Sequence, residues 1–268
     1  MTSEDLALRG VQFVWRRFFN WVAEVGRVTM LLGDTARMLI PGLGSFRLLV
    51  QQCYAIGVGS LPLVFVVSLF TGAVAAVQAA YQFSNVVPLK FIGSVILRSV
   101  IIELGPVLTA LIVGGRVGAS IAAELGTMKV TEQVDALRAM AINPVRFLVV
   151  PRVVGAIIML PVLTVFADAI GVFGGWVVSV TTVGVSTHTY VTGLKTFYYN
   201  KDLFSGLLKA VFFGGIIGTM GCYSGFATEG GAEGVGQATT RAVVASCVLV
   251  LISDYVLANV LFRFIFAS

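Results

Sequence analysis

The fold is decided by residues 115–144, which read GRVGASIAAELGTMKVTEQVDALRAMAINP. This segment is charged and mostly compatible with helix, and it lies between two long apolar runs. A membrane protein that works alone rarely needs a compact charged insert in such a place, whereas one that takes mechanical work from a soluble partner does. We therefore interpret residues 116–144 as a coupling segment, and we expect the chemistry to lie in another subunit.

The composition around this segment is that of an integral membrane protein. Of the 268 residues, 57% are hydrophobic and only 12% are charged, whereas soluble domains contain about 25% charged residues. Several stretches reach the roughly 20 apolar residues that a transmembrane helix needs. No compact apolar core precedes a small-residue cleavage site, so we do not expect a cleavable signal at the N-terminus. The sequence predicts one all-α polytopic membrane domain.

Residues 6–38 show the pattern of an amphipathic helix. Apolar side chains recur at spacings of three and four, while arginines and other polar side chains occupy the opposite side. Tryptophan and phenylalanine beside these arginines favour a helix that lies in the membrane interface. The alternative is a surface helix of a soluble domain, but no soluble core follows. Pro41-Gly42 should end this interfacial region, residues 1–45, before the membrane domain, residues 46–268.

Five apolar runs follow, each long enough to cross a bilayer. Pro106 interrupts the second run. The third is longer than one crossing requires, and Pro161 inside it predicts a kink or a tilt. The predicted spans are residues 53–80, 91–113, 147–180, 204–226 and 242–266.

Basic residues in the connecting segments predict the orientation. With the N-terminus inside, the cytoplasmic segments contain twelve lysine and arginine residues, and the outer loops contain three, Lys90, Lys195 and Lys201. This bias favours a cytoplasmic N-terminus and a periplasmic C-terminus. The coupling segment then faces the cytoplasm, where partners driven by ATP are found.

The coupling segment divides into two predicted helices. Residues 119–125 form the first, with Gly126 suited to its C-terminal cap. Thr131 should cap the second, and Asn143-Pro144 should stop it. The second helix suits either the membrane surface or a groove on a partner. Its apolar stripe comprises Val134, Leu137 and Met140, and its polar faces comprise Glu132, Gln133, Asp135 and Arg138.

Several phrases in and around this segment resemble the MlaE family, which are permease subunits of ABC transporters associated with MCE proteins. The similarity runs from about residue 45 to 265 and includes the layout of an interfacial helix followed by five spans. The phrases are Glu103-Leu104-Gly105-Pro106, Gly115-Arg116-Val117-Gly118, Ala123-Glu124-Leu125-Gly126-Thr127-Met128-Lys129, Thr131-Glu132-Gln133 with Leu137, Met140, Asn143 and Pro144, and Ala238-Thr239-Thr240-Arg241.

This resemblance implies an inner-membrane homodimer that carries phospholipid between the inner and outer membranes. The implied partners are a cytoplasmic ABC ATPase, a periplasmic hexamer of MCE-domain proteins and a small STAS-domain subunit. The chain itself would be no enzyme and would hold no cofactor or metal, since ATP would be used by the ATPase. No nucleic-acid partner is expected.

Glu103 is the candidate for the polar lining of a lipid pocket. An ionisable group deep in a span usually faces a cavity or a partner. Arg98 lies five residues earlier, a loose spacing for one helix face, so pairing of the two within one chain stays open. In the resembling family the dimer encloses a pocket from the first two spans, which implies Gln78, Tyr81 and Val74 as wall residues. The alternative is a buried pair that only holds helices together.

Two further acids, Asp168 and Asp254, lie in spans and raise a second hypothesis, a proton-coupled secondary transporter. Such a carrier needs a chain of midplane acids and inverted repeats. The single histidine, His188, falls in an outer loop, five spans do not divide into two halves, and no repeat is visible. Interhelical hydrogen bonding is therefore the favoured role of both acids. A third hypothesis is a scaffold that only anchors an MCE-type partner.

The remaining motifs predict packing or connection. Residues 227–237 are glycine-rich, but no lysine follows in the phosphate-loop pattern, so we expect a flexible cytoplasmic turn. Cys53, Cys222 and Cys247 lack the spacing of a metal site and should be buried small hydrophobes. Glycines at spacings of three and four in the fourth span indicate a close helix contact, either within the protomer or across a dimer. These glycines are Gly214, Gly215, Gly218, Gly221 and Gly225.

Overall fold

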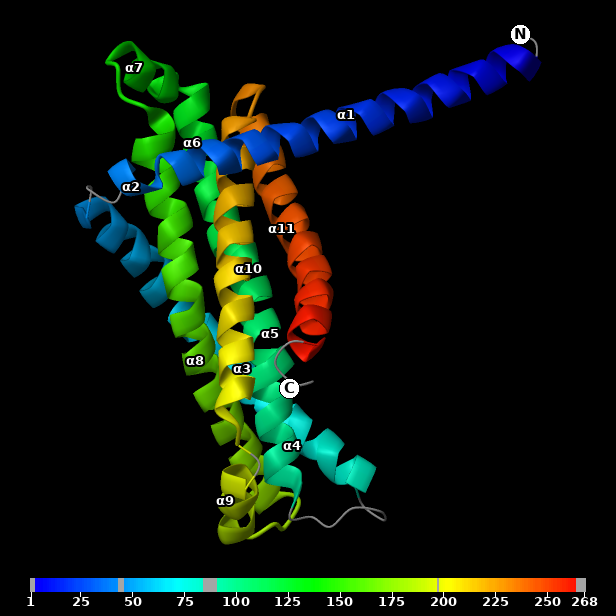
Figure 1. Ribbon diagram of the computed structural model, residues 1–268, viewed down its shortest axis with the longest axis vertical. Helices are drawn as coiled ribbons and strands as arrows, with labels where there is room; N and C mark the ends of the chain where they lie inside the picture. Colours follow the sequence, from blue (N-terminus) through cyan, green and yellow to red (C-terminus); the bar gives the residue numbers. More distant parts are fainter. Residues whose placement is uncertain (1–2, 43–45, 84–90, 197, 264–268) are drawn as a thin grey trace.

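The described residues of this chain form helices and short connections, without a strand among them (Figure 1). A computed structural model describes residues 3–42, 46–83, 91–196 and 198–263. Five helices are long and apolar enough to cross a membrane, which confirms the predicted all-α fold with five spans. The candidate spans are Phe46–Gln82, Ile92–Val130, Val145–Thr181, Asn200–Phe226 and Gly231–Leu261.

The first and third spans pack most extensively against each other. The first is α3 (Phe46–Phe83), and the third comprises a π-helical turn, η4 (Val145–Val149), followed by α8 (Val150–Thr181). Glycine permits their close approach, because a Cβ added at Gly72 or at Gly174 would collide with backbone of the opposite helix. Both helices continue through an internal proline.

The second span is one continuous helical rod from Ile92 to Val130, and it is longer than predicted. The expected short helix over residues 119–125 is therefore the end of this span rather than a separate element. Gly126 does not form the predicted C-terminal cap, because it lies inside the rod. A Cβ added there would come within 2.8 Å of Thr228 Oγ1. The rod comprises α4 (Ile92–Ser99), η2 (Val100–Leu104), α5 (Gly105–Val113), η3 (Gly114–Gly118) and α6 (Ala119–Val130), of which η2 and η3 are π-helical.

The glycines of the fourth span, α10 (Asn200–Phe226), pack within the protomer. An added Cβ at Gly214 would lie 2.5 Å from the carbonyl oxygen of Ala156 on α8. One at Gly225 would lie 2.6 Å from the Leu125 side chain on α6. α10 therefore lies between α8 and α6, and buried apolar side chains of these three helices form most of the main core.

The fifth span, α11 (Gly231–Leu261), begins before the predicted residue 242. The expected flexible turn over residues 227–237 is wrong, because only Ala227–Gly230 lies outside the helices. Gly230 and Gly231 have φ values of 85° and 71°, a left-handed conformation that glycine adopts at little cost. The predicted end of this span at Phe266 lies outside the described residues.

The two ends of the bundle carry different short helices (Figure 1). α1 (Ser3–Arg37), α2 (Leu39–Gly42) and α7 (Gln133–Ala139) lie at one end, and α9 (Thr187–Thr196) lies at the other. The sequence did not predict α9. Its Tyr190 is buried, and the hydroxyl donates a hydrogen bond to the carbonyl oxygen of Val172 at 3.0 Å.

The long N-terminal helix α1 crosses the bundle and extends beyond it (Figure 1). Arg27 Nε donates a hydrogen bond to the Tyr223 hydroxyl of α10 at 3.3 Å. Trp15 and Met30 are 62% and 72% exposed, as expected for apolar side chains that a membrane interface would cover. The helix ends at Arg37 and not at the predicted Pro41-Gly42, which forms the end of α2.

Candidate functional site

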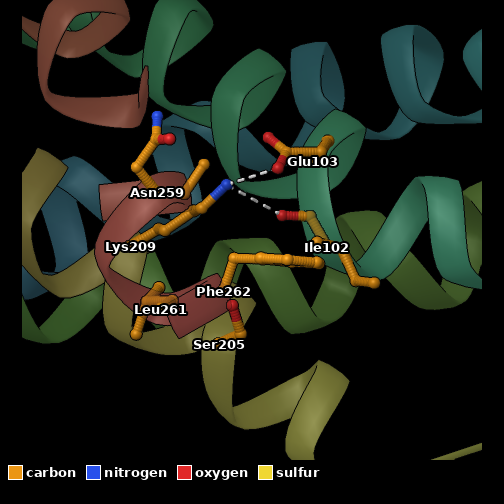
Figure 2. Close-up of a pocket in the computed structure, with 8 residues that line it drawn as sticks. Ile102, Glu103, Ser205, Lys209, Asn259, Leu261 and Phe262 are labelled. Carbon is orange, nitrogen blue, oxygen red and sulfur yellow. Dashed lines mark hydrogen bonds and ion pairs between the residues drawn. The ribbon is translucent and has the colours of Figure 1, made fainter. Parts of the chain in front are cut away.

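A buried lysine joins three spans in the half of the bundle nearer α9. Lys209 on α10 is 1% exposed, and its Nζ lies 2.7 Å from Glu103 Oε1 and 2.9 Å from Asp254 Oδ1. The same ammonium donates a hydrogen bond to the carbonyl oxygen of Ile102 at 3.3 Å (Figure 2). Burying a charge in an apolar setting is costly unless it is paired. Two carboxylates from two other helices therefore hold this cation in place.

Glu103 owes its position to the π-helical turn η2. A π turn widens the helix by one residue, and such turns occur frequently at functional sites. Here the turn precedes Pro106, which has no backbone N–H to continue the regular pattern. The N–H of Gly105 donates to the carbonyl oxygen of Val100, five residues earlier. Because Pro106 cannot donate to the carbonyl oxygen of Ile102, four residues earlier, that oxygen accepts the bond from Lys209 instead.

Two neighbouring cavities meet at Glu103. One of about 290 Å³ is lined by Glu103, Lys209, Ser205 and Asn259, with apolar walls from Ile102 of η2 and from the end of α11 (Figure 2). The other, of about 410 Å³, is lined by Glu103 and Arg98 with their neighbours on α4 and η2. The side chain of Glu103 is 45% exposed although Lys209 is fully buried. The carboxylate therefore faces both cavities.

Arg98 lies in the second cavity but does not pair with Glu103. Its Nε lies 3.0 Å from Asp202 Oδ2 on α10, and its guanidinium lies over the Tyr199 ring at 5.9 Å. Asp202 and Lys209 are two turns apart on one face of α10, so the two ion pairs join the second and fourth spans at two levels. Arg98 and Glu103 thus line the same cavity, although Arg98 pairs with Asp202 and Glu103 pairs with Lys209.

The other predicted wall residues are not brought to these cavities. Val74, Gln78 and Tyr81 are all exposed on α3, with Tyr81 84% exposed, and none of them lines either cavity. Their place in a lipid pocket stays a prediction for the assembled protein.

Sequence reasoning missed Lys209. The available signal was a single lysine deep in an apolar run, the same signal that singled out Glu103. Asp254 joins two spans, but through an ion pair with Lys209 rather than through the predicted hydrogen bond. Asp168 is buried against Gly105, and within the described part of the chain its Oδ1 has no hydrogen-bond partner. Cys222 is buried as expected, whereas Cys53 and Cys247 are only half-buried.

The helix α7 carries the predicted coupling residues, but its apolar stripe is divided. Val134 is buried and Leu137 packs partly against the main core, so these two residues hold α7 onto its own chain. Met140 is 62% exposed. The surface open to a partner therefore consists of Met140 with the exposed polar residues Glu132, Gln133, Asp135 and Arg138.

The ends of α7 differ from the prediction. Thr131 does not cap the helix, because its hydroxyl donates to the carbonyl oxygen of Thr127. Glu132 occupies the cap position in a left-handed conformation, with φ of 60°. The helix ends at Ala139, before Asn143-Pro144, and Asn143 Oδ1 instead accepts a hydrogen bond from the N–H of Val145. Asn143 thus begins the third span rather than ending α7.

Asp135 near the start of α7 forms one ion pair with the second span and one within α7 itself. Asp135 lies 3.0 Å from Lys129 Nζ and 2.9 Å from Arg138 Nη1. The hydrogen bond from Lys129, aided by Arg138, lowers the pKa of the Asp135 carboxyl. Both pairs are exposed, so each contributes little stability alone; together they orient the polar surface of α7.

Comparison with known proteins places this architecture among permeases. Residues 49–260 match the family model described as permease MlaE. The chain is 48% identical over 218 residues to a probable ABC transporter permease protein of Rickettsia typhi, covering 81% of this chain and 83% of that protein. It is 35% identical over 218 residues to the intermembrane phospholipid transport system permease protein MlaE of Haemophilus influenzae, covering 81% and 84%. It is 32% identical over 252 residues to the chloroplastic protein TRIGALACTOSYLDIACYLGLYCEROL 1 of Arabidopsis thaliana, covering 94% and 70%.

Proposed function

Because this chain belongs to the MlaE permease family, we propose that it is the membrane subunit of an ABC transporter that moves phospholipid between the inner and outer membranes. The named functions of its relatives support this proposal, as do its five candidate spans. ATP is hydrolysed in a separate subunit, so the chain itself needs no cofactor and is not an enzyme.

Glu103 carries the proposal, because its half-exposed carboxylate faces two cavities inside a membrane span. A phospholipid has a polar headgroup and two apolar tails, and it needs a site with both characters. Glu103, Ser205 and Asn259 offer polar groups, and the apolar side chains of α11 beside them offer a wall for a tail.

A homodimer would complete this pocket. The described part of one chain leaves both cavities open at the surface, and large apolar side chains on α3 and α11 are exposed. In an isologous dimer the same patch of each copy meets at a two-fold axis. Such a contact would enclose the cavities and give Val74, Gln78 and Tyr81 a place in the wall.

We assign the end that carries α1 and α7 to the cytoplasm, in keeping with the excess of lysine and arginine there. The ABC ATPase then docks on the exposed surface of α7, and a small STAS-domain subunit accompanies the ATPase. The periplasmic MCE-domain hexamer meets the opposite end, near α9.

Photo-crosslinking in the assembled transporter tests the pocket. A crosslinking amino acid at residue 78, 81 or 103 should capture phospholipid, whereas one at Gln133 on α7 should not. Glu103→Ala and Val74→Trp should lower lipid transport without lowering expression. Equal capture at residue 133, or full transport by both variants, would leave these residues with a packing role only.

Two rival functions give different results in the same preparation. A scaffold that only anchors an MCE-type protein should still permit lipid passage when the ATPase is inactivated by mutation, whereas the proposed transporter should stop. A proton-coupled carrier should respond to a proton gradient without ATP. The two acids that raised the carrier hypothesis differ in the described structure, because Asp254 pairs with Lys209 whereas Asp168 Oδ1 has no hydrogen-bond partner.

A further inference from the structure

Arg116 is a charged residue of the second span that lies away from both cavities. It is exposed, and it belongs to the π-helical turn η3. Its Nη1 donates hydrogen bonds to Ser60 Oγ at 3.0 Å and to the carbonyl oxygen of Ala55 at 3.5 Å, both on α3. Both acceptors are neutral. Among the described residues, no carboxylate lies within ion-pair distance of this guanidinium.

The surroundings of Arg116 are shaped to hold a guanidinium. Gly59 on α3 has no side chain, and an added Cβ would collide with Arg116 Nη2. On the other side of η3, Gly114 and Gly118 lie beside Ile217 of α10 and Ser246 of α11. The rod therefore packs its glycine face into the bundle and directs Arg116 onto α3. Its Nε and Nη2 have no acceptor in the part of the chain that the structure describes.

Two polar residues follow Arg116 at one-turn intervals on an exposed face of α6. The Ser120 hydroxyl donates to Glu124 Oε1 at 3.4 Å, and Glu124 Oε2 lies 3.1 Å from Arg152 Nη2. Arg152 thereby neutralises Glu124. We define Arg116, Ser120 and Glu124 as a polar stripe. Within the described residues, the positive charge of Arg116 in this stripe has no anionic partner.

The position of α1 sets the depth of the stripe. α1 meets α10 at Tyr223, and the nearby Gly221 packs against Ile121 of α6. Arg116 precedes Ile121 by five residues, roughly 8 Å along the helix axis. With α1 in the membrane interface, Arg116 lies about one and a half turns to the membrane side of that level, in the leaflet at the α1 and α7 end.

We propose that Arg116 binds the phosphate group of a phospholipid from the leaflet at the α1 and α7 end of the membrane. A charged side chain that faces hydrocarbon is costly without an anion. The Nε and Nη2 edge of a guanidinium matches two oxygens of a phosphate, which gives short and strong bonds. This site is distinct from the cavities at Glu103 and goes beyond the proposed function.

Photoreactive lipids test the site in the complete transporter. The probes are a phosphatidylethanolamine and a diacylglycerol that carry the same photoreactive group next to the glycerol, in vesicles of phosphatidylethanolamine and phosphatidylglycerol. Labelling of residues 115–130, read by mass spectrometry, should favour the phospholipid at least about tenfold, as expected for a charge-assisted hydrogen bond. Arg116→Gln should abolish this preference, and Arg116→Lys, which keeps the charge, should retain part of it.

Matched variants separate this site from a folding defect and from the Glu103 cavities. Arg241→Gln removes an exposed cation of α11 outside both cavities and should leave the labelling preference at residues 115–130 unchanged. Capture at residue 103, measured in the same samples, reports on the proposed transport pocket independently. If Arg116→Gln lowers the melting temperature, the test rests on Arg116→Lys, which keeps the charge and should retain part of the preference for the phospholipid.

Three results would overturn the proposal. The first is equal labelling by phospholipid and diacylglycerol, or an unchanged preference in Arg116→Gln. The second is loss of the preference in a large excess of inorganic phosphate, which would assign the site to a free anion. The third is a crosslink between two copies of the chain through residues 115–124, which would assign the stripe to a protein contact.

Discussion

Lys209 is buried, and acids from two other helices compensate its charge. At the scale of single residues, removing one of the three charged side chains should destabilise the fold more than replacing all three with neutral side chains. A carboxylate that loses its ammonium inside a span must take up a proton or reach water, and both cost free energy. The cluster therefore keeps the second, fourth and fifth spans in one relative position.

Lys209→Met should lower the free energy of unfolding by about 3 kcal/mol, because it leaves Glu103 and Asp254 without a cation. Adding Glu103→Gln and Asp254→Asn to the same chain should recover most of the loss. Thermal unfolding in detergent micelles measures both effects. Lys195→Met, at an exposed position of α9, is the control and should change stability by less than about 0.5 kcal/mol. Equal effects of the two lysine variants would contradict the ion-pair role.

The residues that carry charge in the spans were partly predictable. Glu103 and Asp254 stood out because an acid in an apolar run needs a partner. The identity of the partner was not predictable, since Glu103 and Lys209 are 106 residues apart and periodicity describes only neighbours on one helix. The same reason explains why the grouping of Val74, Gln78 and Tyr81 with Glu103 was not found within one chain.

At the scale of helices, the glycines of α10 set how closely neighbouring spans approach. Gly214→Val should destabilise the bundle by about 1–3 kcal/mol, because its Cβ would lie 2.5 Å from the carbonyl oxygen of Ala156. Gly215→Val is the matched control, since nothing lies closer than 3.8 Å to its Cβ. Thermal unfolding of the two variants in one detergent makes the comparison. A control as unstable as the test variant would show that side-chain bulk, rather than the contact with α8, is responsible.

Substitutions on the exposed surface of α7 can weaken binding of a partner without altering the main core. Met140→Asp together with Glu132→Lys should reduce the amount of ATPase that co-purifies with the chain at least about tenfold, a loss of roughly 1.4 kcal/mol of binding. Both side chains are exposed, so membrane insertion should be unaffected. Leu137→Asp is a poor test, because Leu137 packs partly against the main core. Undiminished recovery of ATPase by the double variant would remove α7 from the docking surface.

The ion pairs of Asp135 predict a pH dependence confined to α7. The partners lower the carboxyl pKa in the folded chain, so their contribution is fully present above the unfolded pKa of about 3.9. It is lost as the pH falls through the lower, folded pKa. Hydrogen exchange of residues 133–139 should therefore accelerate below about pH 4, after correction for intrinsic rates. Asp135→Asn should show no such step, and a step of equal size in that variant would point to another group.

Helix existence was more predictable than helix boundaries. Apolar runs identify all five spans, since length and composition alone decide whether a helix can cross a membrane. The ends were misplaced where glycine was taken as a stop, as at Gly126 and at residues 227–237. In this bundle many glycines lie at helix contacts rather than at helix ends, and only the neighbouring helix distinguishes the two. The π-helical turns have no sequence periodicity of their own, so the exact path of the second span was not predictable.

At the scale of the whole molecule, the orientation in the membrane has a direct test. In a background without the three natural cysteines, single cysteines at Gln133 on α7 and at His188 on α9 should react with an impermeant label from opposite sides. Gln133 should react only from the cytoplasmic side. Both positions are exposed, so access to label is not limited by packing. Labelling of both from one side would be incompatible with an odd number of crossings between them.

The continuous second span has a mechanical consequence. Its 39 residues form a shaft about 58 Å long, with α7, the proposed docking helix, at one end and Glu103 nearer the other. A shaft of this kind transmits torque: a twist applied at α7 reaches the carboxylate unless η3, which lies between them, takes up the strain. Adding or removing one residue at η3 would turn the two halves relative to each other by about 100°. The extra residue of that turn thus sets the angle about the rod axis between the proposed docking helix α7 and the carboxylate of Glu103.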